Sequence, residues 1–122
     1  MALAVIDRFR RRYFNATMAD ISTASSVYIT MPCRGRVVRA YVTIDAAITS
    51  ADSALTASIN GTAITGMTGT AANSGSAAGS SFTLADATAA RDFVDGDVVK
   101  LTTDGASSTT AVAQWTLVVD TY

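Results

Sequence analysis

Hydrophobic and polar residues alternate in short runs along most of this chain, and no apolar stripe has the length and spacing of a helix. The clearest runs predict strands at Arg36–Ile44, Leu55–Ile64, Ser81–Leu84, Asp97–Thr102 and Ala111–Val119. A period of two residues is typical of a strand with one buried face. Gly, Asp and Asn separate the runs, as turn residues do. The pattern therefore predicts an all-β domain.

Shorter signals fill in the connections between these runs. Val27–Met31 is a further strand candidate, ended by Pro32, which lacks the backbone donor that a sheet needs. Asn60-Gly61 between two alternating runs predicts a type I′ hairpin, since both residues tolerate a positive φ. Gly66–Ser80 is rich in small residues and is expected to form an exposed loop at the outer tip. Asp86–Phe93 is compatible with either one helical turn or a loop.

Two of the predicted strands have distinctive faces. In Arg36–Ile44 the apolar face is expected to consist of every second residue, namely Val38, Ala40, Val42 and Ile44. The last strand is apolar on both faces, which predicts a central position in its sheet. Its tryptophan, Trp115, stands between apolar neighbours and is expected in the core.

Composition supports the same fold class. Ala, Thr, Ser and Gly account for 61 of the 122 residues, and the acidic residues are all Asp. Small side chains predict a thin core, and an exposed helix would normally carry Glu and Lys. We therefore expect a single antiparallel β-sandwich, jelly-roll-like, with about eight strands over residues 15–122. An extended N-terminal arm, residues 1–14, is expected to precede it.

The residue types exclude most catalytic chemistry. The chain has no His and no Glu, and Cys33 is its only cysteine, expected as a small half-buried side chain. Serine or cysteine catalysis with a His base, and a Cys/His zinc site, are thus excluded. We expect no catalytic residue, no cofactor and no metal. Two alternatives stay open: Asp pairs could support a small hydrolase, or Asp95, Asp97 and Asp104 could converge on Ca²⁺.

Charge is unevenly distributed, although the formal net charge is only −1. This balance predicts neither nucleic-acid nor membrane binding. The N-terminal run Met1–Ile6 is too short for a secretory signal, so folding in a cytoplasm is expected. Arginines and aromatic residues, which are enriched at protein interfaces, gather in two places. The predicted contact residues, toward a partner protein or between subunits, are Arg8, Phe9, Arg10, Arg11, Arg12, Tyr13, Phe14, Arg34, Arg36 and Arg39.

Two stretches carry a family resemblance. One runs from Arg39–Ile44 through Ala46–Asp52 to Ala57–Thr62, and the other covers Asp95–Gly105 and the strand that follows. Both resemble small bacteriophage capsid decoration, or cement, proteins. The resemblance implies a non-enzymatic β-sandwich that binds the outside of a phage capsid and stabilises the shell. It also implies a homotrimer, the major capsid protein as partner, and a place on the virion surface.

One alternative function stays open at this stage. Phage head-fibre and tail-tip modules use similar Ala/Thr/Gly-rich β-domains to bind a receptor or a carbohydrate. Such modules usually gather several aromatic residues on one face, whereas the single Trp and the four Tyr of this chain are scattered. We therefore expect no small-molecule substrate and favour the decoration protein.

Overall fold

The strands of this protein pair across the length of the chain, first with last and second with second-to-last. The computed structural model describes residues 10–122. Its strands are β1 (Arg10–Met18), β2 (Ser25–Thr30), β3 (Gly35–Ile44), β4 (Ser53–Ile59), β5 (Thr62–Ala71), β6 (Ser81–Leu84), β7 (Asp92–Phe93), β8 (Val98–Thr103) and β9 (Ala113–Thr121). β1 pairs with β9, β2 with β8, β3 with β6 and β4 with β5, all antiparallel.

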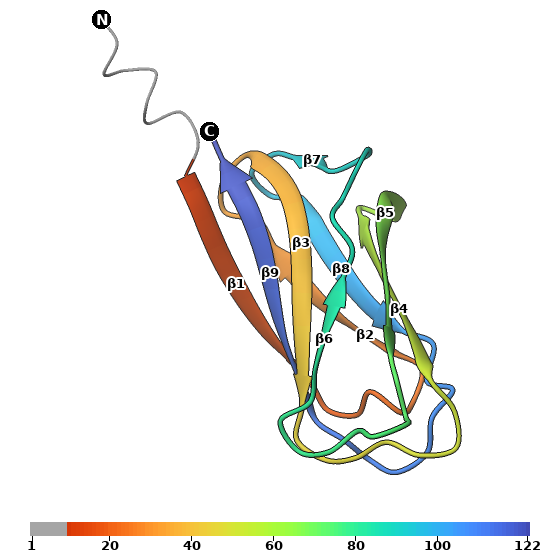
Figure 1. The fold of residues 1–122 in the computed structure, drawn as a ribbon. Helices are drawn as coiled ribbons and strands as arrows, with labels where there is room; N and C mark the ends of the chain where they lie inside the picture. Colours follow the sequence, from red (N-terminus) through yellow and green to blue (C-terminus); the bar gives the residue numbers. More distant parts are fainter. Residues whose placement is uncertain (1–9) are drawn as a thin grey trace, which may run out of the picture.

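Two sheets result from this nested pairing (Figure 1). One has the order β1-β9-β3-β6, with the short β7 also beside β3, and the other has the order β2-β8-β4-β5. Most connections therefore cross from one sheet to the other. Eight strands arranged in this way form a jelly roll, a double-sheet fold made of two Greek keys. The predicted jelly-roll-like sandwich is confirmed, with nine strands where about eight were expected.

The core fills the space between the two sheets. Trp115 is its largest fully buried side chain, as predicted, and β9 is a central strand between β1 and β3. Half-buried Cys33 packs against this core, also as predicted. Many other core side chains are small, and four of the fully or almost fully buried ones are Ala40, Ala57, Ala111 and Ala113. The core therefore combines large side chains such as Trp115, Met18 and Met67 with these alanines.

The predicted hairpin joins β4 and β5. Asn60 and Gly61 have φ angles of 48° and 87°, the left-handed values that a type I′ turn requires. The prediction of a loop over Gly66–Ser80 is partly wrong, because β5 continues to Ala71. The pairing of β4 with β5 is irregular between Thr56 and Ser58. Four residues of β5, 64–67, form a bulge at this point, and Gly66 within it has a φ of 83°.

The connections β1–β2, β3–β4, β5–β6 and β8–β9 meet at one end of the sandwich (Figure 1). Hydrogen bonds between them join Thr49 to Ser108 and the backbone N–H of Asn73 to the Asp52 carboxylate. The backbone N–H of Ala54 donates to Asp104 in the same way. Residues 72–80, the part of the predicted Gly66–Ser80 loop that lies outside β5, are thus hydrogen-bonded to the neighbouring β3–β4 connection.

The other end carries β7 and both ends of the described chain (Figure 1). Of the two alternatives for Asp86–Phe93, the loop is correct: the segment is extended and ends in β7, which pairs with Gly35 and Arg36 of β3. No helix long and apolar enough to span a membrane occurs within residues 10–122.

The N-terminal region differs from the expected arm. Arg10–Phe14 are the first five residues of β1 and pair with β9, so this part of the predicted arm belongs to the sheet. The cause is the alternation of Phe14, Ala16 and Met18 toward the core, which the preceding run of arginines obscures in the sequence. The other arm residues, 1–9, with the predicted contacts Arg8 and Phe9, lie outside the described part of the chain.

Candidate functional site

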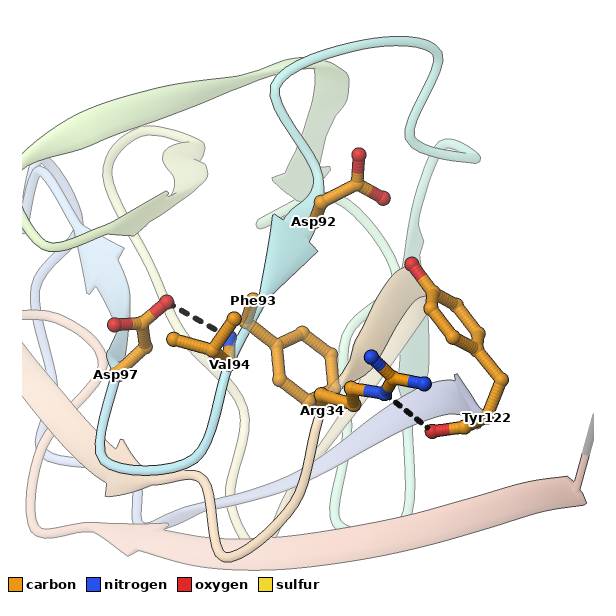
Figure 2. A pocket seen from close by; sticks show the side chains of 6 residues that line it. All are labelled: Arg34, Asp92, Phe93, Val94, Asp97 and Tyr122. Carbon is orange, nitrogen blue, oxygen red and sulfur yellow. Dashed lines mark hydrogen bonds between the residues drawn. The ribbon is translucent and has the colours of Figure 1, made fainter.

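A pocket of about 290 Å³ opens at the end of the sandwich where the described chain begins and ends (Figure 2). Six residues line it: Arg34, Asp92, Phe93, Val94, Asp97 and Tyr122. The guanidinium of Arg34 lies over the Tyr122 ring, 5.6 Å from its centroid, and its Nε donates to the Tyr122 carbonyl at 3.1 Å. Arg34, a predicted contact residue, is therefore held by the C-terminal strand region.

The Asp97 carboxylate in this pocket has a structural role. It accepts the Val94 backbone N–H and an Asn60 amide N–H, both at 2.9 Å. These hydrogen bonds, first that of Val94 and then that of Asn60, lower the pKa of Asp97. The lining contains no Ser, Thr, Cys or His, and its two carboxylates are Asp92 and the hydrogen-bonded Asp97.

The structure contradicts the convergence of Asp95, Asp97 and Asp104 on one Ca²⁺. Asp95 and Asp97 precede β8, and Asp104 follows it, so the full length of a strand separates them. Asp104 instead accepts the backbone N–H groups of Ala54 and Ala106. Residues 10–122 contain no group of three or more side chains of the metal-binding types. Asp97 and Asp104 therefore stabilise the connections on either side of β8.

Four of the ten predicted contact residues, Arg11, Tyr13, Arg36 and Arg39, lie together on the outer face of the β1-β9-β3-β6 sheet. The register sets Arg11, Asp120 and Arg36 side by side across β1, β9 and β3. The next row on the same face consists of Tyr13, Val118 and Arg39. Residues more than 20 positions apart in the sequence thus form one surface, here named the arginine face: Arg11, Tyr13, Arg36, Arg39, Tyr41, Asp86 and Asp120.

A bulge in β3 puts both of its arginines on this face. Arg36 and Arg39 are three residues apart, so strict alternation would place them on opposite faces. The pairing with β9 skips Val38, and Arg36 and Arg39 face Asp120 and Val118, two positions apart on β9. The expected apolar face is wrong at this point: Val37, not Val38, is fully buried. The bulge explains the difference, since one extra residue reverses the alternation.

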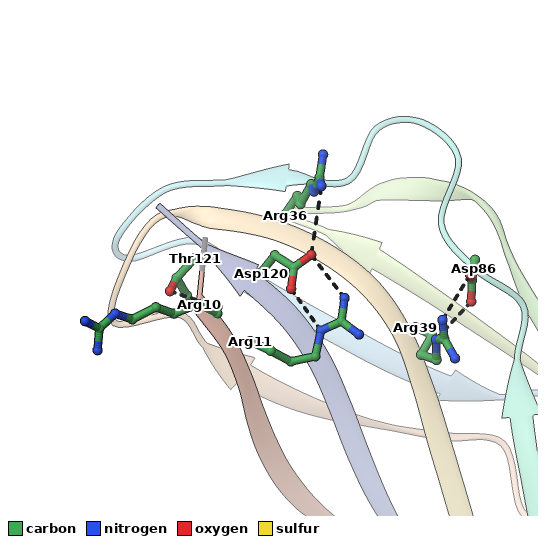
Figure 3. A network of polar contacts seen from close by, with 7 residues as sticks. All are labelled: Arg10, Arg11, Arg36, Arg39, Asp86, Asp120 and Thr121. Atoms are coloured by element: carbon green, nitrogen blue, oxygen red, sulfur yellow. Dashed lines mark hydrogen bonds and ion pairs between the residues drawn. The ribbon is translucent and has the colours of Figure 1, made fainter. Parts of the chain in front are cut away.

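Asp120 lies between Arg11 and Arg36 on the arginine face and contacts both (Figure 3). Arg11 donates to it twice, Nε to Oδ1 at 2.9 Å and Nη2 to Oδ2 at 3.2 Å, while Arg36 Nη2 lies 3.9 Å from Oδ2. The Asp120 side chain is only 13% exposed, against 47% for Arg11. The hydrogen bonds from Arg11 lower the pKa of Asp120 more than burial raises it. The two guanidinium groups are therefore held over a fixed anion.

Arg39 is fixed in a similar way. Its Nη2 donates to Asp86 Oδ2 at 3.2 Å, its Nε lies 3.0 Å from Oδ1, and its Nη1 donates to the Tyr41 hydroxyl at 3.2 Å. Contact with Tyr41 and then with Asp86 raises the pKa of Arg39. With Arg11 and Arg36, the arginine face carries three arginines, two tyrosines and two carboxylates, and Asp92 of β7 lies opposite Arg36 at its margin.

The rest of this sheet face is neutral and polar. Thr116 donates to Asn15 at 3.1 Å, and Thr17 donates to Gln114 at 3.0 Å. The remaining predicted residues of β1 lie on its other side. Phe14 packs against the core, and Arg10 extends away from the arginine face in Figure 3. Arg12 shares the side of Arg10 and Phe14, because it too lies an even number of residues away.

Comparison with known proteins adds likeness to solved structures, but no family. No family model matches the chain, and no curated protein matches it. Among solved structures it is similar to a chain of the "Cyanophage Pam1 capsid asymmetric unit". That match covers 93% of this chain and 85% of the other, at 15% sequence identity and a TM-score of 0.48. The jelly roll described above rests on the strand pairing itself, independently of this likeness.

Proposed function

We propose that this protein is a structural virion protein that binds the outside of a phage capsid and stabilises the shell. The observation that carries the proposal is the arginine face, where Arg11, Arg36 and Arg39 are gathered from two strands beside exposed tyrosine. Arginine and tyrosine are enriched where binding energy concentrates at protein interfaces. The sequence resemblance to capsid decoration proteins supports the same assignment, and the major capsid protein is the proposed partner.

The geometry favours docking without large rearrangement. Asp120 and Asp86 hold the guanidinium groups in place, which reduces the side-chain ordering that binding would otherwise cost. Arg11 uses two of its five N–H donors for Asp120, so others remain for an acidic partner surface. A capsid repeats that surface many times, and linked copies would gain avidity from modest individual contacts.

The test is co-sedimentation with phage capsids assembled without this protein. Arg11→Glu is expected to weaken binding at least about tenfold, because it places a carboxylate beside Asp120. Arg12→Glu is the matched control: it is the next residue of β1, equally exposed, and points to the other side. Equal losses in both variants, or none in Arg11→Glu, would refute the arginine face as the contact.

The N-terminal arm stays part of the proposal. Deletion of residues 1–9 tests the part of the arm that precedes the described β1 strand, Arg10–Met18. We expect this deletion to preserve the fold and to weaken capsid binding. The resemblance implies a homotrimer, and the mass of the protein in solution tests this expectation against the two-chain assembly proposed below.

The receptor- or carbohydrate-binding alternative has one observation in its favour. The end pocket presents Tyr122, which is 45% exposed, beside Asp92 and Arg34. An aromatic ring with polar neighbours suits a sugar ring. Binding of glycans that is abolished by Tyr122→Ala would establish this alternative, and a glycan array without hits would remove its support.

A further inference from the structure

The edge of the β1-β9-β3-β6 sheet formed by β1 has unpaired backbone groups. Three hydrogen bonds fix which ones. Tyr122 donates to Arg34 and Asp45 donates to Val112 on the β3 side of β9, while Ile21 donates to Ala111 on the β1 side. In β9 the even-numbered residues therefore bond to β3 and the odd-numbered ones to β1.

The same alternation carries over to β1. Its even-numbered residues face the odd-numbered residues of β9, from Arg10 opposite Thr121 to Met18 opposite Ala113. The N–H and C=O groups of its odd-numbered residues, Arg11, Tyr13, Asn15 and Thr17, consequently point away from the sheet. Within the described chain, no strand pairs with β1 on that side. An open edge of nine residues is a template for another strand.

We propose that β1 pairs antiparallel with β1 of a second copy, about a two-fold axis at Phe14. In this register Arg11 faces Thr17 of the second copy and Tyr13 faces Asn15. All four outward-facing residues of each strand are then hydrogen-bonded, giving about eight backbone hydrogen bonds. This contact goes beyond the proposed function and does not depend on a capsid.

The side chains of β1 are self-complementary in this register. Phe14 meets its own copy across a non-hydrogen-bonded pair, where Cα atoms lie about 4.5 Å apart. Tyr13 is 63% exposed in the single chain, and the two copies of Tyr13 become diagonal neighbours within reach of each other. The arginines lie at the two outer ends, opposite Met18, Thr17 and Ala16, so no like charges face one another.

Charge also favours a second copy over an unrelated strand. Edges that avoid pairing usually carry charges or Pro along their length. In β1 the charges stop at Arg12, and residues 13–18 are uncharged and contain no Pro. The uncharged half of one strand matches the charged half of the other only in an antiparallel pair. A parallel pairing in register would set the arginines of the two copies side by side.

The test is the mass in solution, measured by sedimentation equilibrium over a range of concentrations. The wild-type protein is expected at twice the chain mass of 12.6 kDa. Asn15→Pro removes an outward-facing N–H and adds a ring at the edge, so it is expected to raise the dimer dissociation constant more than tenfold. Asn15→Ala loses the hydrogen bond with Thr116 but keeps the N–H, and is expected to stay dimeric.

A second experiment reads the register directly and does not depend on proline. In a Cys33→Ser background, Phe14→Cys is expected to give a disulfide-linked dimer on oxidation, because residue 14 faces itself. Asn15→Cys, which faces Tyr13, is expected to cross-link far less. A wild-type mass of one or three chains, or equal cross-linking at both positions, would overturn the pairing. Capsid binding by a purely monomeric protein would overturn it while leaving the proposed function intact.

Discussion

Several individual Asp side chains of this protein stabilise loops by accepting hydrogen bonds from nearby backbone and hydroxyl groups. Asp20 is the clearest case: it accepts the Ser22 backbone N–H at 2.9 Å, the Thr23 hydroxyl at 2.9 Å and the Ala111 backbone N–H at 3.2 Å. The last of these ties the β1–β2 connection to the segment before β9. Burial opposes ionisation of Asp20, but the hydrogen bonds outweigh it, and the pKa is lowered. The absence of Glu is understandable, since its longer side chain reaches neighbouring backbone less well.

The lowered pKa predicts how stability depends on pH. Around pH 4 the unfolded chain binds more protons at Asp20 than the folded protein, so this contribution is complete above about pH 5 and is lost as the pH falls through the folded-state pKa. Asp20→Asn is therefore expected to be less stable by about 1–2 kcal/mol at pH 7, with a smaller difference near pH 2. Urea midpoints across this range measure it. Asp95→Asn is the control, and a difference that does not change with pH would contradict the prediction.

At the level of elements, alternation and turn chemistry made most strands predictable. β6 was placed correctly at both ends, and the Asn60-Gly61 turn was identified from its two residues alone. The bulge at Val38 was not predictable, because the neighbouring residues Val37 and Val38 are the same type, and only the pairing partner decides which is buried. The arginine face was missed as a surface for the same reason, although its arginines were named.

The bulge in β3 can be tested by removing it. Deletion of Val38 leaves Arg36 and Arg39 two residues apart, so strict alternation keeps both on the arginine face, and Val37 stays opposite Val119. We therefore expect the deletion to cost well below the value for a buried charge without a partner, which is about 3 kcal/mol. Val38→Ala keeps the extra residue and is expected to lose equally little. Denaturant titration compares the two variants; a loss of about 3 kcal/mol or more in the deletion alone would show that β3 needs the extra residue to keep Arg36 on the outer face.

For the whole molecule, the nested pairing means that the first and last strands must meet. β9 lies between β1 and β3, so this sheet cannot be completed until the last strand is in place. Thr17 and Gln114, hydrogen-bonded across β1 and β9, are 97 residues apart in the chain. Closing such long loops costs entropy before the contacts stabilise the fold. The alanine-rich core gives little compensation early in folding.

This topology predicts slow, cooperative folding. We expect refolding from urea to take milliseconds to seconds, the range of β-sandwiches dominated by distant pairings. Trp115, the only tryptophan and fully buried, reports on the closing of β9 by fluorescence. Far-UV circular dichroism should change at the same rate if the sheets form together with the core. Completion within microseconds, or a circular dichroism signal that precedes the Trp115 signal, would mean that one sheet forms without the other and that the nested pairs are not the rate-limiting step.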